Sequence, residues 1–417
     1  MSLASTVKEN IGGKPACLRV LHNVFKVMNS IATALKLKEW TFIQQNFDKI
    51  AQNYFGVLIP INLSGKCDKK QDNENVNISL VLKLAPTDER YRVSGAVTMF
   101  FEKEIFVYTK VLRRYQEIQR TFPLPQYVMP ECYYVRNDYC YELLAIQNMC
   151  AENYKPFISS MFLDIDHITV ALISLARFHA LSYIFEKTDK NLFEEAKNVC
   201  VPITEKNNKR YLDILLDRLK KALSKFENTN YAPLFEALKH GYINIIESAT
   251  NSVKSLCLCH GDIWKENILF KYEKNLPTSA CIIDYQTTRI SSPAYDVLYL
   301  IMSSTCSSLR KKHFKHLLDV YYETFEQALN QANLNSKEIY SRAVLEDDLV
   351  IVGPTCLIMA NTAIWLASGL QEEGHVKSKI VLSTDAEKSK AVAQYKNIIS
   401  GIIDDLLDNN YLSTVIF

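Results

Sequence analysis

The spacing of apolar residues changes twice in the first third of the chain. Residues 16–50 place apolar side chains three and four positions apart, which predicts a helix. From Val57, and again from Ile78, apolar residues occupy every second position, which is the period of a β-strand. The stretch between these two runs, 65–77, is rich in Asp, Asn and Lys. We therefore predict a β-hairpin with a long exposed tip.

The later segments predict a helical protein with a second, smaller group of strands. Residues 98–114 return to helical spacing, and residues 132–144 indicate two more strands around a turn. The remainder is mostly helical, except for a run of short strands and turns at 255–290. The fold class that follows is α+β, with a small β-rich N-terminal lobe at 1–144 and a large, mainly helical C-terminal lobe at 145–417.

One uncharged run is long enough to cross a bilayer. It extends from Leu349 to Leu370 and contains Gly353, Pro354 and several polar residues. It lacks the basic flank that anchors a membrane helix. We therefore expect a buried core helix here and no membrane span, with a transmembrane helix as the alternative.

Composition excludes several classes of protein. Hydrophobic residues make up 48% of the 417 and charged residues 23%, as in globular proteins. The net charge of +2 argues against a nucleic-acid binder, which normally carries a basic excess. The eleven cysteines form no C-x-x-C pair, and Met1–Pro15 has no apolar signal segment. These features predict free thiols and a cytoplasmic location. The sequence does not indicate the oligomeric state.

The residues with the clearest chemistry lie at 259–286. Asp262 follows a His-Gly pair, Asn267 lies five residues later, and Asp284 ends an apolar strand 17 residues after Asn267. Asp262 can accept a proton, and Asn267 and Asp284 offer the hard oxygen ligands that Mg²⁺ prefers. The segments between them are suited to a short hairpin that brings Asn267 and Asp284 together.

This spacing matches the catalytic loop H-x-D-x-x-x-x-N of protein kinases and, less closely, the later D-F-G. The alternative is that a His-Gly-Asp turn and an Asp at a strand end are ordinary loop residues. Because Asn267 and Asp284 both occupy the expected positions, the kinase interpretation is favoured.

Phosphoryl transfer also requires a cation for the nucleotide phosphates. Lys83 interrupts an otherwise apolar strand, and Glu104 lies on the apolar stripe of the next helix, whereas Glu102 and Lys103 fall outside that stripe. We therefore predict that Glu104 pairs with Lys83. The alternative is an edge-strand lysine whose ammonium group reaches water.

No G-x-G-x-x-G motif precedes Lys83. The turn that covers the phosphates is instead expected at Gln52–Gly56, which contains Asn53.

Several motifs together resemble the ecdysteroid kinase-like (CHK kinase-like) family of arthropods, which is related to choline kinases and aminoglycoside phosphotransferases. The resemblance runs from about residue 50 to residue 300 and implies a bilobal, protein-kinase-like fold. Its motifs are Asn53-Tyr54, Leu82-Lys83-Leu84, Phe101-x-x-Glu104, Leu175-Ala176-x-Phe178-His179-Ala180, His260-Gly261-Asp262-x-Trp264-x-x-Asn267, Asp284-Tyr285-Gln286 and Ser292-Pro293-Ala294-x-Asp296.

The resemblance assigns roles to the residues at these positions. Asp262 would be the catalytic base, and Asn267 and Asp284 would be the Mg²⁺ ligands. Lys83 would anchor the phosphates of ATP, with Glu104 holding it.

It also implies roles outside the chemistry itself. The segment Glu142-Leu143-Leu144 would contact adenine through backbone groups. Asp296 would be structural and would accept hydrogen bonds from the catalytic loop. His179 and His260 are likewise interpreted as structural.

Two departures from protein kinases indicate the acceptor. Trp264 replaces the basic residue of the catalytic loop, and only 12 positions separate Asp284 from Asp296, with no A-P-E triplet between them. That segment is too short for a peptide-docking activation loop. The expected reaction is therefore ATP-dependent phosphorylation of a small-molecule alcohol. The resemblance suggests an ecdysteroid, a steroid hormone. The alternatives are a choline-like, aminoglycoside-like or xenobiotic alcohol, and a catalytically silent nucleotide-binding protein.

Overall fold

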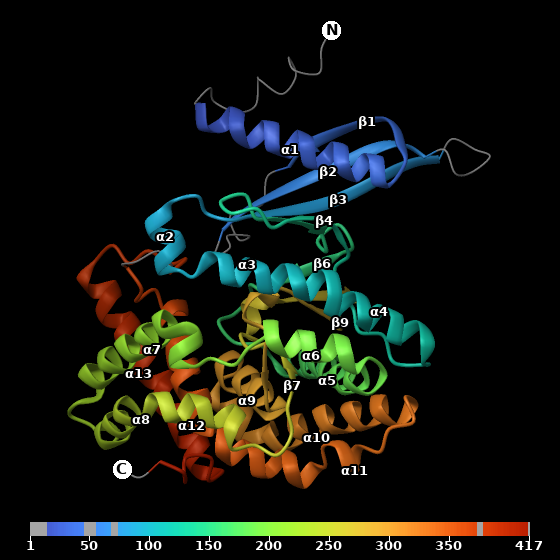
Figure 1. Cartoon of the computed structure of the whole chain (residues 1–417). Coiled ribbons are helices and arrows are strands. Elements are labelled where there is room, and N and C mark those ends of the chain that lie inside the picture. Colours follow the sequence, from blue (N-terminus) through green and yellow to red (C-terminus); the bar gives the residue numbers. More distant parts are fainter. Residues whose placement is uncertain (1–14, 46–55, 68–73, 373–377, 416–417) are drawn as a thin grey trace. The chain divides into compact units, whose positions relative to one another are not determined.

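The computed structural model describes residues 15–45, 56–67, 74–372 and 378–415. They form two compact units (Figure 1). The first comprises the described residues up to Ala85 together with Glu131–Asn148, and the second comprises Pro86–Pro130 and the described residues from Met149 onwards. Residues 86–130, which were expected in the N-terminal lobe, are thus grouped with the larger unit.

The first unit is a five-stranded antiparallel sheet in the order β1-β2-β3-β5-β4, with one helix against it. Its elements are α1 (Pro15–Ala34), β1 (Leu37–Gln44), β2 (Val57–Cys67), β3 (Glu74–Leu84), β4 (Cys132–Arg136) and β5 (Leu143–Gln147).

Helix α1 packs on the sheet through residues three and four positions apart. Val27, Met28 and Ile31 are buried and share a core with Ile61 and Leu80. The prediction of a helix over 16–50 is wrong for 35–45, because β1 follows α1 within three residues. Residues 46–50 lie outside the described residues. Trp40 and Phe42 of β1 pack on this core, and that long-range contact outweighs the local helical spacing.

The predicted hairpin is confirmed, but the prediction of an exposed tip over 65–77 is wrong for 65–67 and 74–77, which pair as strand residues. Strands β2 and β3 pair continuously from Val57 opposite Leu84 to Cys67 opposite Glu74. Strand β3 also pairs with β5, so it is an interior strand of the sheet. The tip of the hairpin at 68–73 lies outside the described residues.

The second unit is mainly helical. Its helices are α2 (Glu89–Ser94), α3 (Val97–Phe106), the π-helical segment η1 (Val107–Val111), α4 (Leu112–Thr121), α5 (Ile165–Thr188), α6 (Lys190–Val199), α7 (Glu205–Phe226), α8 (Ala232–Asn251), α9 (Pro293–Ser304), α10 (Ser307–Gln331), α11 (Ser336–Ile339), α12 (Arg342–Ala367) and α13 (Asp385–Asp408). Its strands are β6 (Tyr154–Pro156), β7 (Cys257–Cys259), β8 (Ile268–Glu273), β9 (Leu276–Ile282) and β10 (Arg289–Ser291).

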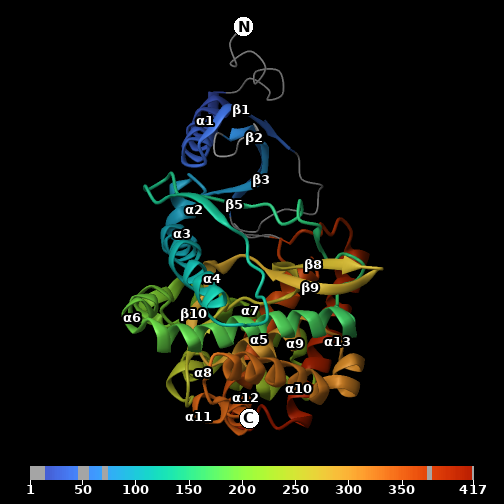
Figure 2. The same ribbon diagram turned by 90° about the vertical axis from the view of Figure 1, so that its right-hand side faces the viewer.

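Two helices organise this unit. Helix α5 lies beneath the β8–β9 hairpin and packs on α10 with its other side (Figure 2). Helix α12 packs against α7, α8, α9 and α13. Most of its residues from Val352 onwards are buried, which confirms that the uncharged run forms a core helix.

Two stretches of the described residues are long and apolar enough to cross a membrane by length and composition alone. They are α5 and the stretch Ser336–Ala367 that contains α12. In each, 78% of the most apolar window is buried within the protein. Core helices of a large unit have the same length and composition, so this is weak support for a membrane span.

Candidate active site

The segment with the predicted catalytic residues joins two short sheets of the second unit. Strand β7 leads into the loop that begins at His260 and contains Asp262, and a 3₁₀ turn at Lys265–Asn267 then leads into β8. Strand β7 pairs with β10 through Cys259 opposite Arg289. Both ends of the loop are therefore fixed by strands.

Asp296 holds the start of this loop from helix α9. Its Oδ2 accepts a hydrogen bond from the backbone N–H of His260 at 2.6 Å, and its Oδ1 accepts one from Gly261 at 3.0 Å. His179 of α5 lies against the same carboxylate, with Nε2 3.1 Å from Oδ2. Asp296 is fully buried. Its predicted bonding to the catalytic loop is confirmed.

His260 connects the loop to the strand that ends at Asp284. Its Nε2 lies 3.0 Å from the carbonyl oxygen of Ile283, so this nitrogen is the donor and carries the proton. Its Nδ1 then accepts from the backbone N–H of Asp262 at 3.4 Å. Burial lowers the pKa of His260, which favours this neutral form. The residue acts as a structural bridge.

Gly261 is required by its backbone conformation and by close packing. Its φ of +86° lies in the region that side chains disfavour. A Cβ atom here would lie 2.4 Å from the carbonyl oxygen of Thr287 and 2.5 Å from Nη1 of Arg289. Only glycine allows the loop to pass this close to the residues that follow Asp284.

The β8–β9 hairpin brings Asn267 and Asp284 together, as predicted. Ile268 pairs with Ile282, and the N–H of Ile283 donates to the carbonyl of Asn267 at 3.0 Å. Asp284 follows directly, in the left-handed conformation with φ 68° and ψ 64°. Residues that are far apart in the sequence therefore lie at the same end of one hairpin.

The carboxylate of Asp262 is oriented by two donors. The hydroxyl of Tyr299 donates to Oδ1 at 3.0 Å, and Nδ2 of Asn267 donates to Oδ2 at 3.3 Å. Burial, followed by the negative charge of Asp284, raises the pKa of Asp262 to about 7. A carboxylate whose pKa lies near neutral pH is suited to accept a proton from a substrate.

The donor set of Asn267 and Asp284 fits a hard divalent cation. Nδ2 of Asn267 also donates to the backbone carbonyl of Asp262 at 2.8 Å, and this fixes the orientation of the amide. The amide oxygen is then the atom of Asn267 that remains as a ligand. With the carboxylate of Asp284, it supplies the oxygen ligands that Mg²⁺ prefers.

Lys83 lies in the interior of the first unit's sheet. It is opposite Leu58 of β2 and Leu144 of β5, and its side chain is only 4% exposed. The alternative of an edge-strand lysine in water is therefore wrong. Strand alternation places Lys83 on the face opposite Leu82, away from the core shared with α1.

The other predicted nucleotide contacts are distributed over both units. Glu104 is buried on α3 of the second unit. Glu142 and Leu144 are buried in the first unit, where the carbonyl of Glu142 accepts from Ala85. Asn53 lies outside the described residues. The roles of these residues in nucleotide binding stay predictions.

The register of β5 defines the backbone contacts of Leu144. It is paired with β3 on one side and with β4 on the other, so its backbone groups lie within the sheet. The contact of Glu142, Leu143 and Leu144 with adenine stays a prediction.

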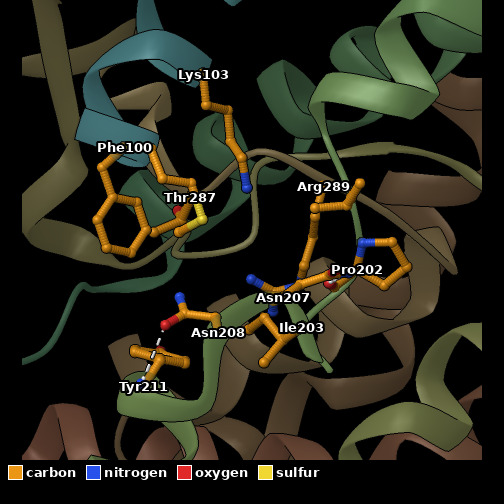
Figure 3. A pocket seen from close by; sticks show the side chains of 11 residues that line it. Phe100, Lys103, Pro202, Ile203, Asn207, Asn208, Tyr211, Thr287 and Arg289 are labelled. Carbon is orange, nitrogen blue, oxygen red and sulfur yellow. Dashed lines mark hydrogen bonds between the residues drawn. The ribbon is translucent and has the colours of Figure 1, made fainter. Parts of the chain in front are cut away.

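Sequence reasoning missed Tyr299, Lys103 and Arg289. Tyr299 lies one turn after Asp296 on α9, and this helical spacing was the available signal. Lys103 was expected outside the apolar stripe of its helix but is only 5% exposed, and Arg289 is 6% exposed. Both line a pocket beside the catalytic loop (Figure 3).

His179, Cys257 and Cys259 lie close enough together to bind a metal ion, but their bonding and protonation disfavour a metal site. Both ring nitrogens of His179 already face partners, Tyr321 and Asp296. Burial raises the pKa of both thiols, which disfavours the thiolates that bind metals. The cluster is better described as part of the core around α5.

A model of the ecdysteroid kinase-like family matches residues 51–334. A comparison with curated proteins gave no match.

Solved structures similar to this chain include the GDP and kanamycin complex of the aminoglycoside phosphotransferase APH(2")-IIIa, with a TM-score of 0.38 and 15% identity over 93% of this chain and 99% of that one. A putative fructosamine-3-kinase from Haemophilus somnus has a TM-score of 0.34 and 11% identity over 88% and 96%. A glucosamine kinase has a TM-score of 0.41 and 10% identity over 92% and 84%. Because the family model covers more than half of the sequence, this chain belongs to the ecdysteroid kinase-like family.

Proposed function

We propose that this small-molecule kinase transfers the γ-phosphoryl group of ATP to a hydroxyl of its acceptor, with Mg²⁺ bound by Asn267 and Asp284. The class of kinase follows from the family. The nucleotide, the metal and the alcohol acceptor are the proposal.

The orientation of Asp262 supports this proposal most directly. Each of its carboxylate oxygens accepts one hydrogen bond, from Tyr299 and from Asn267, and each retains a further acceptor site. The backbone before it is fixed by Asp296, so the carboxylate is held in place before the acceptor binds. Such preorganisation is the main contribution a protein makes to phosphoryl transfer.

In the reaction, Asp262 would accept a hydrogen bond from the acceptor hydroxyl and then take its proton. The hydroxyl oxygen forms a bond to the γ-phosphorus, and the bond between that phosphorus and the β–γ bridging oxygen breaks. Mg²⁺, when bound, would neutralise charge on the β- and γ-phosphates. Its positive charge beside Asp284 would also offset one cause of the raised pKa of Asp262.

Lys83 would contribute from the interior strand β3. Its side chain is buried. We propose that it binds the phosphates of ATP and pairs with the carboxylate of Glu104, as the family resemblance implies.

For the acceptor, we propose an ecdysteroid hydroxyl, which rests on the family alone. The alternatives are a choline-like, aminoglycoside-like or xenobiotic alcohol. A cytoplasmic location is also proposed. It is supported by the ten cysteines among the described residues, all of which are free thiols.

The test is to incubate the full chain with ATP, Mg²⁺ and a metabolite extract and to identify by mass spectrometry the compounds that gain a phosphate. We expect phosphorylated products from the wild type and from the surface control Asp408→Asn, and almost none from Asp262→Asn. Unchanged transfer by Asp262→Asn would contradict its role as the base. Binding of ATP without any phosphorylated product would favour the catalytically silent alternative.

A further inference from the structure

A pocket in the second unit contains two buried cations. It is lined by α3, by residues 201–203, by the start of α7 and by the segment from Thr287 to Arg289. Figure 3 shows that the side chains of Lys103 and Arg289 enter it from different elements. Both side chains are more than nine-tenths buried. A molecule bound in this pocket would therefore lie near two positive charges.

Neither cation has a polar partner within the described residues. No hydrogen bond or ion pair joins Lys103 Nζ or the Arg289 guanidinium to another residue there. Arg289 instead stacks on the ring of Tyr295, with 4.6 Å between the guanidinium carbon and the ring centroid. Burial lowers the pKa of Lys103 to about 8. The buried charge of Lys103 is therefore costly, and a bound anion would remove that cost. Burial also disfavours the charge of Arg289, but nearby groups that include Asp296 outweigh burial and raise its pKa.

The start of α7 adds to the positive potential. Asn208 has non-helical φ and ψ of −153° and 62°, so the regular helix begins after it. Its Oδ1 accepts a hydrogen bond from the N–H of Tyr211 at 3.1 Å, as in an N-cap. Asn207, Asn208 and Tyr211 line the pocket, which places the positive end of the helix dipole beside the two cations.

The remaining lining is apolar. Met99 and Phe100 of α3 form one part of the wall, and the segment Val201–Ile203 forms another. A mixed lining of this kind suits an organic acid, whose apolar body and anionic group bind to different parts of the wall.

The pocket lies next to the loop that carries the predicted base. The guanidinium of Arg289 is so close to Gly261 that a Cβ atom there would lie 2.5 Å from Nη1. Gly261 directly precedes Asp262, and Arg289 covers the ring of Tyr295, which is stacked on Tyr299, the donor to Asp262. A molecule in this pocket would therefore lie near the residue that we propose as the base.

We propose that Lys103 and Arg289 bind a carboxylate or sulfate group of the acceptor, so that the favoured substrates are apolar alcohols that also carry an acidic group. This inference rests on the proposed function, because it presumes that the acceptor hydroxyl is presented to Asp262. The phosphates of ATP have the same anionic chemistry. The apolar wall, and the absence of Asn267 and Asp284 from the lining, favour the acceptor.

The experiment compares acids with neutral amides of the same shape. Calorimetry on the full chain, without nucleotide, measures binding of para-(hydroxymethyl)benzoate and its amide, and of cholate and its amide. We expect the wild type to bind at least one acid about tenfold more tightly than the matched amide. Lys103→Met should abolish that preference. Lys110→Met, which removes an exposed lysine of η1, should retain it.

Two further measurements separate the sources of the anion. Lys103→Met should bind Mg-ATP as the wild type does, and it should unfold at a higher temperature because an unpaired buried charge has been removed. Equal affinity of the wild type for acid and amide in both pairs would overturn the proposal. A Lys103→Met protein that loses affinity for Mg-ATP but keeps the preference for acids would also overturn the proposal. A preference for acids in a protein that phosphorylates no alcohol would support the site and overturn only the proposed function.

Discussion

Asp296 accepts a hydrogen bond from the backbone N–H of His260 at 2.6 Å and another from the backbone N–H of Gly261. These two bonds fix the direction in which the catalytic loop leaves β7. Both bonds require an acceptor, and the two oxygens of one carboxylate supply both. This buried side chain therefore connects helix α9 to the predicted base, which lies two residues after His260.

Replacing Asp296 with asparagine should reduce both stability and activity. The amide offers one acceptor oxygen in place of two, so one backbone N–H would face an NH₂ group. We expect the free energy of unfolding to fall by about 2–4 kcal/mol, because a buried donor loses its partner and a charged hydrogen bond is lost. Urea denaturation of Asp296→Asn measures this, with Asp408→Asn on the surface as the control. A variant as stable as the control would contradict this role.

The pair of His179 and Asp296 predicts a dependence of stability on pH. Burial disfavours the protonated ring of His179, but its interactions with Asp296 and Cys259 together outweigh burial and raise the pKa to about 9 from 6.5. A raised pKa stabilises the folded state fully below pH 6.5, and the contribution is lost as pH rises towards 9. It amounts to at most on the order of 3 kcal/mol.

The measurement is the difference in unfolding free energy between the wild type and His179→Gln. That difference should shrink as the pH is raised from 6 to about 9. A difference that stays constant over this range would show that His179 is not protonated in the folded protein.

Replacing Asp284 with asparagine tests the metal site while preserving the backbone. Asparagine tolerates the left-handed conformation found here, so the hairpin should remain intact. We expect the affinity for ATP in the presence of Mg²⁺ to fall about tenfold or more, since a charged ligand becomes neutral. Affinity for ATP in the presence of a chelator should change little. A fall of equal size in both conditions would indicate a general defect in the site instead.

Lys83→Met tests the phosphate anchor. Methionine preserves most of the apolar length of the side chain within β3, so the first unit should still fold. We expect the KM for ATP to rise and kcat to fall, together lowering kcat/KM by about a hundredfold. Lys66→Met, at the exposed far end of the same hairpin, is the matched control. Steady-state kinetics that are the same for both variants would contradict the assignment.

The sequence was informative about residues linked by local structure. Asn267 and Asp284 could be placed together because a two-stranded hairpin links them, and strand spacing is visible in the sequence. Asp296 could be assigned through the family resemblance, because it ends the motif Ser292-Pro293-Ala294-x-Asp296.

Features that depend on long-range packing were not predictable. Lys103 is polar in sequence, and its burial depends on residues near 201–211 that come about a hundred positions later. Strand β1 was missed because its spacing fits a short helix, and only packing against the sheet selects the strand. The grouping of residues 86–130 with the second unit likewise depends on long-range packing.

The β8–β9 hairpin also has a consequence for how this site can change over evolution. Its tip is the two-residue turn Lys274-Asn275, in which both residues have left-handed φ values, 49° and 68°. Insertions at that tip would lengthen a surface loop and leave the separation of Asn267 and Asp284 unchanged. A single residue inserted within either strand would turn one of the two side chains to the opposite face. Homologues that remain active should therefore vary in length at the turn and not along the strands.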